Sequence, residues 1–139
     1  MRGGEGPRPS GGPAPTELRR LAPHVYLQAF GSGVDARTLQ DFLARVETQM
    51  PSFERPFAWV VDIHLAVRAT SVHRRLFAEH DRRTVALDRE HCAGVGLVVK
   101  NAVMRGMVTA VHWMQPPVYP YVVTNGRAEA LEFCRTSLA

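Results

Sequence analysis

The sequence predicts an α/β domain in which a mostly parallel sheet of four to five strands is covered by about four helices. Three compact apolar runs lie at 57–64, 93–100 and 118–124, and a fourth at 25–30 precedes them. Amphipathic segments of helical length separate these runs. Such alternation is typical of parallel sheets with helices on their faces. We therefore expect the functional residues at the carboxyl ends of the strands.

Length and composition indicate one folded domain behind a leader. The chain has 139 residues, enough to bury a proper core. Glycine and proline dominate its start, so we expect a disordered leader over 1–17 and a domain over 18–139. No apolar run approaches the ~18 residues of a membrane span, and no secretory signal follows the N-terminal charge. We therefore expect a cytoplasmic protein without a membrane span.

The net charge of +4 comes almost entirely from arginine, because Lys100 is the single lysine. We attribute this imbalance to a GC-rich coding genome. Aromatic residues are not interleaved with the arginine pairs, so we expect no nucleic-acid partner. Cys92 and Cys134 lack paired spacing and are expected to be reduced packing residues.

The first half of the domain is predicted to contain a short element, a strand, a helix and a buried strand. Residues 17–21 fit an edge strand or a turn of helix, and Pro23 ends them. Strand 25–30 is followed by a helix that opens at Val34 or Asp35 and stops at Met50. The apolar face of this helix repeats through Leu39, Phe42, Leu43 and Val46. The run 57–63 predicts a central strand buried on both faces.

In the second half, Ser71 is a credible N-cap for a helix to about Asp88. We expect its core face to be Val72, Leu76, Val85 and Leu87, and its outer face to be Arg74, Arg75, Asp81, Arg82, Arg83 and Arg89. A buried strand over 93–99 precedes a helix that begins at Asn101 or Ala102, with Val103, Met107, Ala110, Val111 and Met114 along it. A last strand ends at Thr124, and 127–138 forms a closing helix.

Asp62 stands at the end of the most buried predicted strand, where a carboxylate needs a partner. The candidates are the backbone amides of its own loop, His64 and Lys100. Two interpretations stay open: Asp62 fixes its loop, or it contacts a ligand or partner directly.

Thr70 and Ser71 lie where the exit loop of this strand meets a helix N-terminus. Free amides and the helix dipole favour negative charge there, and Arg68, Arg74 and Arg75 are near in sequence. A phosphorylation or anion site is one interpretation of this segment, and a plain cap is the other.

Other constellations argue against enzymatic chemistry. His73 and His80 are seven residues apart, whereas zinc pairs on a helix are normally three or four apart. Gly-x-Ser-x-Gly is absent, so no nucleophile elbow follows a strand. Gly94 and Gly96 lie within a predicted strand rather than a phosphate loop. We expect a non-enzymatic protein without a metal or cofactor.

The order of predicted elements, with a buried strand that ends in aspartate, resembles the STAS class. This class comprises sulfate-transporter and anti-sigma-factor-antagonist domains, with the related SpoIIAA-like proteins. The resemblance covers roughly 18–139 and is carried by Trp59–His64, Thr70-Ser71, Gly94–Val99, Tyr121–Thr124 and Ala128–Leu131. In signalling members a partner kinase phosphorylates a serine at the start of the helix after the central strand. By position this serine corresponds to Ser71 or a residue next to it, although Thr70-Ser71-Val72-His73 replaces the family's Asp-Ser-Ser/Thr-Gly.

Two functional hypotheses follow. The first is a STAS-like protein-interaction or signalling module, a regulatory partner-switch protein whose partner is a kinase, an anti-sigma-like protein or another regulator. Its expected surface is Asp62, His64, Arg68, Ser71, Arg74 and Arg75. The alternative is a binder of a small anionic or lipid-like ligand at the carboxyl ends of the strands. Its expected ligand rim is Lys100, Asn101 and Arg105.

Overall fold

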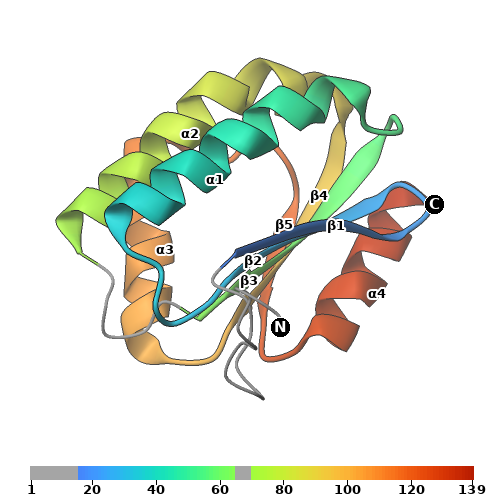
Figure 1. Ribbon diagram of the computed structural model, residues 1–139. Helices are drawn as coiled ribbons and strands as arrows, with labels where there is room; N and C mark the ends of the chain where they lie inside the picture. Colours follow the sequence, from blue (N-terminus) through green and yellow to red (C-terminus); the bar gives the residue numbers. More distant parts are fainter. Residues whose placement is uncertain (1–15, 65–69) are drawn as a thin grey trace, which may run out of the picture.

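The computed structural model describes residues 16–64 and 70–139, which form one five-stranded sheet with helices on both faces (Figure 1). The strands are β1 (Thr16–Ala22), β2 (Val25–Phe30), β3 (Phe57–Ile63), β4 (Cys92–Val99) and β5 (Tyr121–Thr124). Their order in the sheet is their order in the chain. The predicted α/β class is confirmed.

The sheet is mixed rather than wholly parallel. β1 runs antiparallel to β2, while β2, β3, β4 and β5 pair in parallel. Only Pro23 and His24 separate β1 from β2, which is far too short for a parallel crossover. The segment 17–21 is thus an edge strand, one of the two predicted alternatives, and this strand already begins at Thr16. The rest of the expected leader, up to residue 15, lies outside the described residues.

The two strands predicted to form the middle of the sheet do lie side by side and point the same way. Trp59 of β3 pairs with Val95 of β4, and Ile63 pairs with Val99. Strand residues alternate between the two faces, so each of these strands contributes to two cores. Trp59 and Ile63 belong to the larger core, whereas Val60 belongs to the smaller one.

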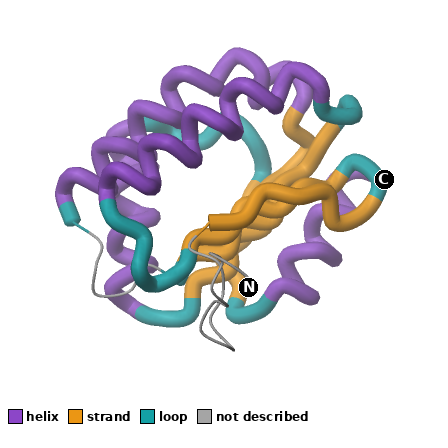
Figure 2. Tube along the Cα trace, viewed as in Figure 1, coloured by secondary structure: helices purple, strands orange, loops and turns teal. Residues whose placement is uncertain are grey.

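Among the described residues, four α-helices cover the sheet: α1 (Ala36–Gln49), α2 (Ser71–His91), α3 (Ala102–Met114) and α4 (Arg127–Leu138). A 3-10 turn, η1 (Met50–Ser52), follows α1. The first three helices lie on one face and α4 lies alone on the other (Figure 2). The larger core fills the space under α1, α2 and α3, and the smaller core packs against α4 through Ala130 and Cys134.

Side-chain caps fix the start of the first three helices. The Asp35 carboxylate accepts a hydrogen bond from the Thr38 N–H at 2.8 Å, and the Asn101 carbonyl oxygen accepts one from the Met104 N–H at 2.8 Å. Thr70, rather than Ser71, is the N-cap of α2. Ser71 is therefore the first helical residue, with its hydroxyl free of the capping role that the sequence suggested.

α4 lies very close to β4 because Gly96 has no side chain. A Cβ atom at Gly96 would lie 2.7 Å from the Cα, Cβ and carbonyl oxygen of Ala130. Real Cβ atoms essentially never approach other heavy atoms so closely. The absence of a side chain at Gly96 thus sets the position of α4, whose first residue is Arg127.

Candidate functional site

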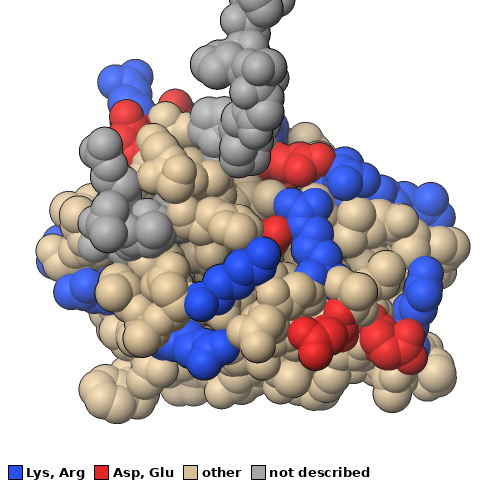
Figure 3. All heavy atoms as spheres, turned by 90° about the horizontal axis from the view of Figure 1, so that it is seen from below, with Lys and Arg blue, Asp and Glu red and all other residues tan. Residues whose placement is uncertain are grey.

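The carboxyl ends of the four parallel strands form one edge of the molecule, called the carboxyl edge below. All four described helices begin there. Each helix N-terminus presents free backbone N–H groups and the positive end of a dipole. Lys and Arg side chains cross the middle of this edge (Figure 3). The carboxyl edge therefore combines four helix N-termini with a band of cationic side chains, which Asp and Glu side chains border (Figure 3).

Asp62 is buried at the carboxyl edge, with 3 % exposure. Its Oδ2 accepts a hydrogen bond from the Nε–H of Arg127, the first residue of α4, at 2.6 Å. The His64 Nε2 lies 2.8 Å from the Asp62 Oδ1, close enough for an ion pair if His64 is protonated. The angles at this contact do not meet those of a hydrogen bond. His64 is one of the predicted partners; among the ion pairs of the described residues, none joins Lys100 to Asp62. Arg127 was not predicted, because 65 residues separate it from Asp62.

The start of α2 is anchored by a buried histidine. The Thr70 hydroxyl accepts from the His73 N–H at 3.3 Å, and the His73 Nδ1 lies 3.3 Å from the Thr70 N–H, which closes a capping box. The His73 Nε2 lies 3.0 Å from the Val34 carbonyl oxygen, so this nitrogen carries the donated proton. These contacts tie α2 to the loop after β2. Ser71 and Val72 are exposed next to this anchor.

The predicted arginine surface is only partly assembled. Arg75 is exposed and Arg74 is half-buried, both in the first turns of α2. Arg68 lies outside the described residues. Farther along the helix, Arg83 is drawn into a bidentate contact with Glu47 of α1, at 2.9 and 3.0 Å. Among the described residues, the cationic side chains nearest to Ser71 in the sequence are Arg74 and Arg75.

One residue of the predicted ligand rim, Arg105, lines a groove between α3 and β5. Lys100 and Asn101 are exposed, and the Asn101 side chain is occupied by capping. The Arg105 guanidinium donates to the Asn125 side-chain oxygen at 2.9 Å and lies at the lip of the groove. The groove has a volume of about 330 Å³, with the apolar residues Val108, Tyr121 and Val123 along it. Of the three rim residues, only Arg105 lines this groove.

The inner face of α2 is unexpectedly polar. Its buried residues are His73, Phe77, Ala78, His80, Thr84 and Asp88. The prediction that Val72 faces the core is wrong, since Val72 is 51 % exposed. Asp81, predicted to face solvent, is half-buried. Hydrophobic periodicity assumes an apolar inner face, so a polar one shifts the predicted orientation of the helix.

This polar face borders a cavity of about 80 Å³ between α2, α3 and the sheet, called the central cavity below. Val61 and Leu97 of the two middle strands line it on the sheet side. Val61 is half-buried although it stands in the central strand, because the helices leave the cavity above it. Polar groups around the cavity include Gln28, His80, Asp81, Thr84, Asp88 and Tyr119. Sequence reasoning identified none of them as a site.

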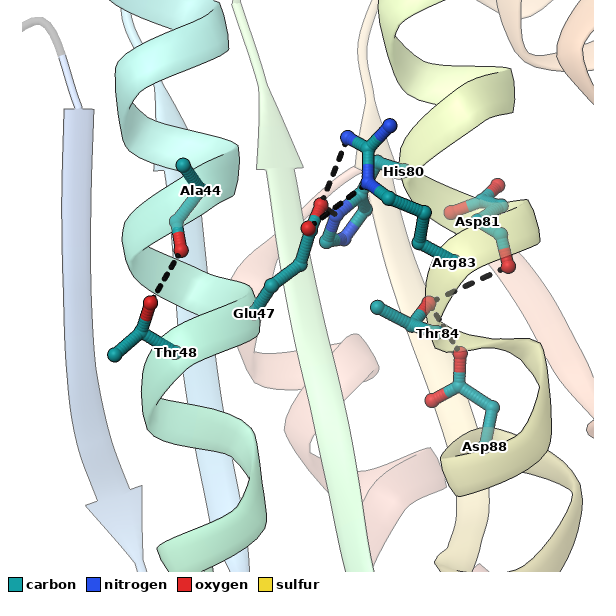
Figure 4. Close-up of polar contacts among 8 residues, drawn as sticks. All are labelled: Ala44, Glu47, Thr48, His80, Asp81, Arg83, Thr84 and Asp88. Carbon is teal, nitrogen blue, oxygen red and sulfur yellow. Dashed lines mark hydrogen bonds and ion pairs between the residues drawn. The ribbon is translucent and has the colours of Figure 1, made fainter.

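One side of the polar face is fully paired (Figure 4). Glu47 reaches from α1 to α2, where its carboxylate accepts from Arg83 and lies 2.7 Å from the His80 Nδ1. Burial lowers the pKa of His80, although the Glu47 carboxylate opposes that effect. Burial also works against ionised Glu47, but the hydrogen bonds from Arg83 and His80 hold its pKa below the ordinary value. This cluster is an ion-paired link between α1 and α2.

On the other side of the polar face, the carboxylates of Asp81 and Asp88 have no ion-pair partner among the described residues. Asp88 is 6 % exposed, and its Oδ2 accepts from the Thr84 hydroxyl at 3.1 Å. Its Oδ1 is buried without a hydrogen-bond partner among the described residues. Burial raises the pKa of Asp88 to about 6. Burial, with the nearby Asp88 charge, raises the pKa of Asp81 to about 7. Two carboxylates whose ionised forms are destabilised by burial thus line one cavity.

Within 16–64 and 70–139, no helix has the length and apolar character needed to cross a bilayer. In the same residues, no three His, Cys, Asp or Glu side chains gather as a metal site would require. Comparisons of the chain with family models, curated proteins and solved structures found no match.

Proposed function

We propose that the chain is a non-enzymatic, cytoplasmic module that acts through protein–protein contact at its carboxyl edge. The observation that carries this proposal is a pair of exposed valines. Val72 and Val103 are 51 % and 60 % exposed, and each is the second residue of its helix. The two helices follow neighbouring strands, so both valines lie on the carboxyl edge. Exposed apolar side chains rimmed by polar groups are typical of interaction surfaces.

Charge around the valines indicates the kind of partner. Lys100 lies three residues before Val103 and Arg75 three residues after Val72, and all four side chains are exposed. Each valine is in the first turn of a helix, where the dipole contributes positive potential. An acidic segment with an apolar anchor fits this combination. The charges would steer association, while the valines would supply the buried centre of the interface.

We further propose that the module is STAS-like and that Ser71 is its regulatory position. The order of strands and helices agrees with the resemblance, and Ser71 is exposed at the first turn of α2. The anchored capping box holds this turn in place, so a phosphate on Ser71 would meet a fixed helix N-terminus. Phosphorylation would add charge beside Val72 and change partner binding.

Substitution of either valine by aspartate tests the contact surface. Val72→Asp and Val103→Asp should each weaken partner capture from native cell extract at least tenfold, because a charge then enters a desolvated centre. Negative charge near a helix N-terminus stabilises the helix, so both variants should stay folded. The measurement is quantitative affinity capture with mass spectrometry. Ser71→Glu should change the same set of captured proteins.

The matched control is Met114→Asp. Met114 is 45 % exposed on α3 as well, but it ends the helix at the opposite edge of the sheet. It should leave capture unchanged. Loss of the captured partners with Met114→Asp, and their retention with both valine variants, would move the contact away from the carboxyl edge and sink the proposal.

The second candidate function is binding of an anionic, lipid-like molecule in the groove between α3 and β5. The observation in its favour is Arg105, which stands at the lip of a groove of about 330 Å³ with Tyr121 and Val123 along it. Ligand pockets typically begin at about this volume. An anionic head group would contact the guanidinium, and the hydrocarbon chain would cover the side chains of β5.

Decanoate is a suitable probe for the groove. Arg105→Gln should weaken decanoate binding about tenfold in isothermal titration calorimetry, since a charge-assisted hydrogen bond is lost. Arg135→Gln on the exposed side of α4 removes the same charge elsewhere and should have no effect. Equal affinities for decanoate and 1-decanol would contradict recognition of the anion.

A further inference from the structure

The central cavity is separate from the carboxyl-edge contact, and it contains a carboxylate without a counter-ion. Asp88 is more than nine-tenths buried, and its Oδ1 has no hydrogen-bond partner among the described residues. Within the same residues, no basic side chain forms an ion pair with Asp88 or Asp81. A buried charge normally has such a partner. Its absence beside a cavity indicates that the partner is a ligand.

The groups around Asp88 make the cavity acidic. Asp81 and Thr84 line it from α2, and Tyr119 lines it from the segment before β5. Cys92, at the start of β4, lies close enough to Asp88 for that charge to raise the pKa of its thiol, together with burial. His112 of α3 also lines the cavity, and burial lowers its pKa, so it is largely neutral. His80 and Arg83 are already engaged by Glu47. None of these groups neutralises Asp88, so a cation is the ligand charge that fits.

The walls and the size of the cavity define the body of the ligand. Trp59, Phe77 and Tyr119 line the cavity, and the faces of such rings attract cations. Val61, Leu97 and other apolar side chains complete the walls, which favours a hydrocarbon body over a hydrated metal ion. A cavity of about 150 Å³ takes up benzene, so the present volume of about 80 Å³ suits a group of about four non-hydrogen atoms.

We propose that the central cavity binds a small organic ammonium ion, with Asp88 as its counter-ion. The ammonium group donates to the Asp88 carboxylate, which lines the cavity, and the short hydrocarbon chain packs against Val61 and the aromatic side chains. The ligand is either a free small amine or the ammonium end of a larger molecule that enters between α2 and the segment before β5.

Trp59 provides a direct readout. It lines the cavity at 4 % exposure, whereas Trp113, the second of the two tryptophans, is 82 % exposed. In a Trp113→Phe background, the fluorescence of Trp59 reports on the cavity alone. The probe is n-propylammonium, with 1-propanol and propionate as the neutral and anionic molecules of similar size. Saturable binding is expected for n-propylammonium, with at least tenfold weaker binding of the other two.

Three variants separate charge from shape. Asp88→Asn keeps the volume and should weaken n-propylammonium binding at least tenfold. Val61→Phe adds a larger side chain that fills the cavity from the side of the sheet. It should abolish n-propylammonium binding although both carboxylates, Asp81 and Asp88, are retained. Asp41→Asn, an exposed change on α1, should leave affinity unchanged. Circular dichroism confirms that each variant is folded.

Ionisation supplies an independent check. An ammonium ion binds the ionised carboxylate, and alkylamines stay protonated below the lysine pKa of about 10.4. Affinity should therefore rise between pH 5 and pH 8, as Asp88 loses its proton near pH 6 and Asp81 near pH 7. Equal binding of 1-propanol, or no probe-induced change in Trp59 fluorescence, overturns the proposal. The proposal is also overturned if the Asp88→Asn variant binds n-propylammonium as tightly as the unsubstituted chain.

Discussion

Replacement of Gly96 by alanine is expected to lower the free energy of unfolding by about 3 kcal/mol, at the upper end of the overpacking range. The added methyl group would lie 2.7 Å from the Cα and carbonyl oxygen of Ala130. These are backbone atoms, so no side-chain rotation can relieve the overlap, and α4 must move away from the sheet. Urea denaturation followed by circular dichroism measures the change.

Gly106 offers a matched control with the opposite sign. It lies on the outside of α3, and a Cβ atom there meets nothing within 4 Å. Gly106→Ala should therefore stabilise the protein by about 0.5–1 kcal/mol through helix propensity alone. If both variants shift the urea midpoint in the same direction, the backbone of α4 does not lie against Gly96 of β4.

The position of α4 also determines the chemistry of the carboxyl edge. Arg127 is its first residue and supplies the 2.6 Å hydrogen bond to buried Asp62. A displaced α4 would separate the two groups and leave the carboxylate without its principal donor. The absence of a side chain at Gly96 and the ion pair at the edge are therefore linked through one helix.

The sequence predicted the parts of the fold that rest on continuous apolar runs. Strands 57–63 and 93–99 needed no tertiary information, because seven or more residues buried on both faces leave a local pattern. The antiparallel β1 was ambiguous, since a half-exposed edge strand and a helical turn share the same few residues. The Asp62–Arg127 pair was beyond prediction, because side chains 65 residues apart meet only after the sheet and α4 have assembled.

The central cavity was missed for a different reason. Sequence reasoning placed apolar side chains of α2 inward and charged ones outward, which is correct for most helices. Here His80, Thr84 and Asp88 face inward instead. Their spacing of four residues is the available signal, because it places all three polar side chains on one face of the helix. Departures from local rules often mark functional positions, and the polar inner face of α2 is such a departure.

Asp88→Asn is expected to raise the free energy of unfolding by about 1 kcal/mol at pH 8, because the roughly 3 kcal/mol cost of the ionised carboxylate is partly offset by burial of the amide N–H groups without a partner. Burial lifts the pKa of Asp88 from 3.8 to about 6, so the ionised form is destabilised in the folded state. Asparagine has nearly the same shape and carries no charge, and its carbonyl oxygen can still accept from Thr84. It also removes the charge that raises the pKa of Asp81. Thermal and urea denaturation of both proteins measure the difference.

The pH dependence of that difference identifies its cause. At pH 8 unsubstituted Asp88 is ionised in both the folded and unfolded states, so the advantage of the variant is complete. As the pH falls through about 6, the folded protein takes up a proton that the unfolded chain binds only near 3.8, and the unsubstituted protein gains stability. The advantage should therefore shrink and be lost by pH 4. Asp41→Asn, exposed on α1, should change stability by less than about 0.5 kcal/mol at every pH.

Stability and binding should then move in opposite directions in one variant. Asp88→Asn makes the folded protein more stable yet should lose n-propylammonium, because the same unpaired charge causes both effects. Sites retained for binding commonly reduce stability in this way. A purely structural carboxylate predicts the reverse, since its removal would destabilise the fold. A fall in the urea midpoint at pH 8 with Asp88→Asn would show that the Oδ1 already has a partner within the protein.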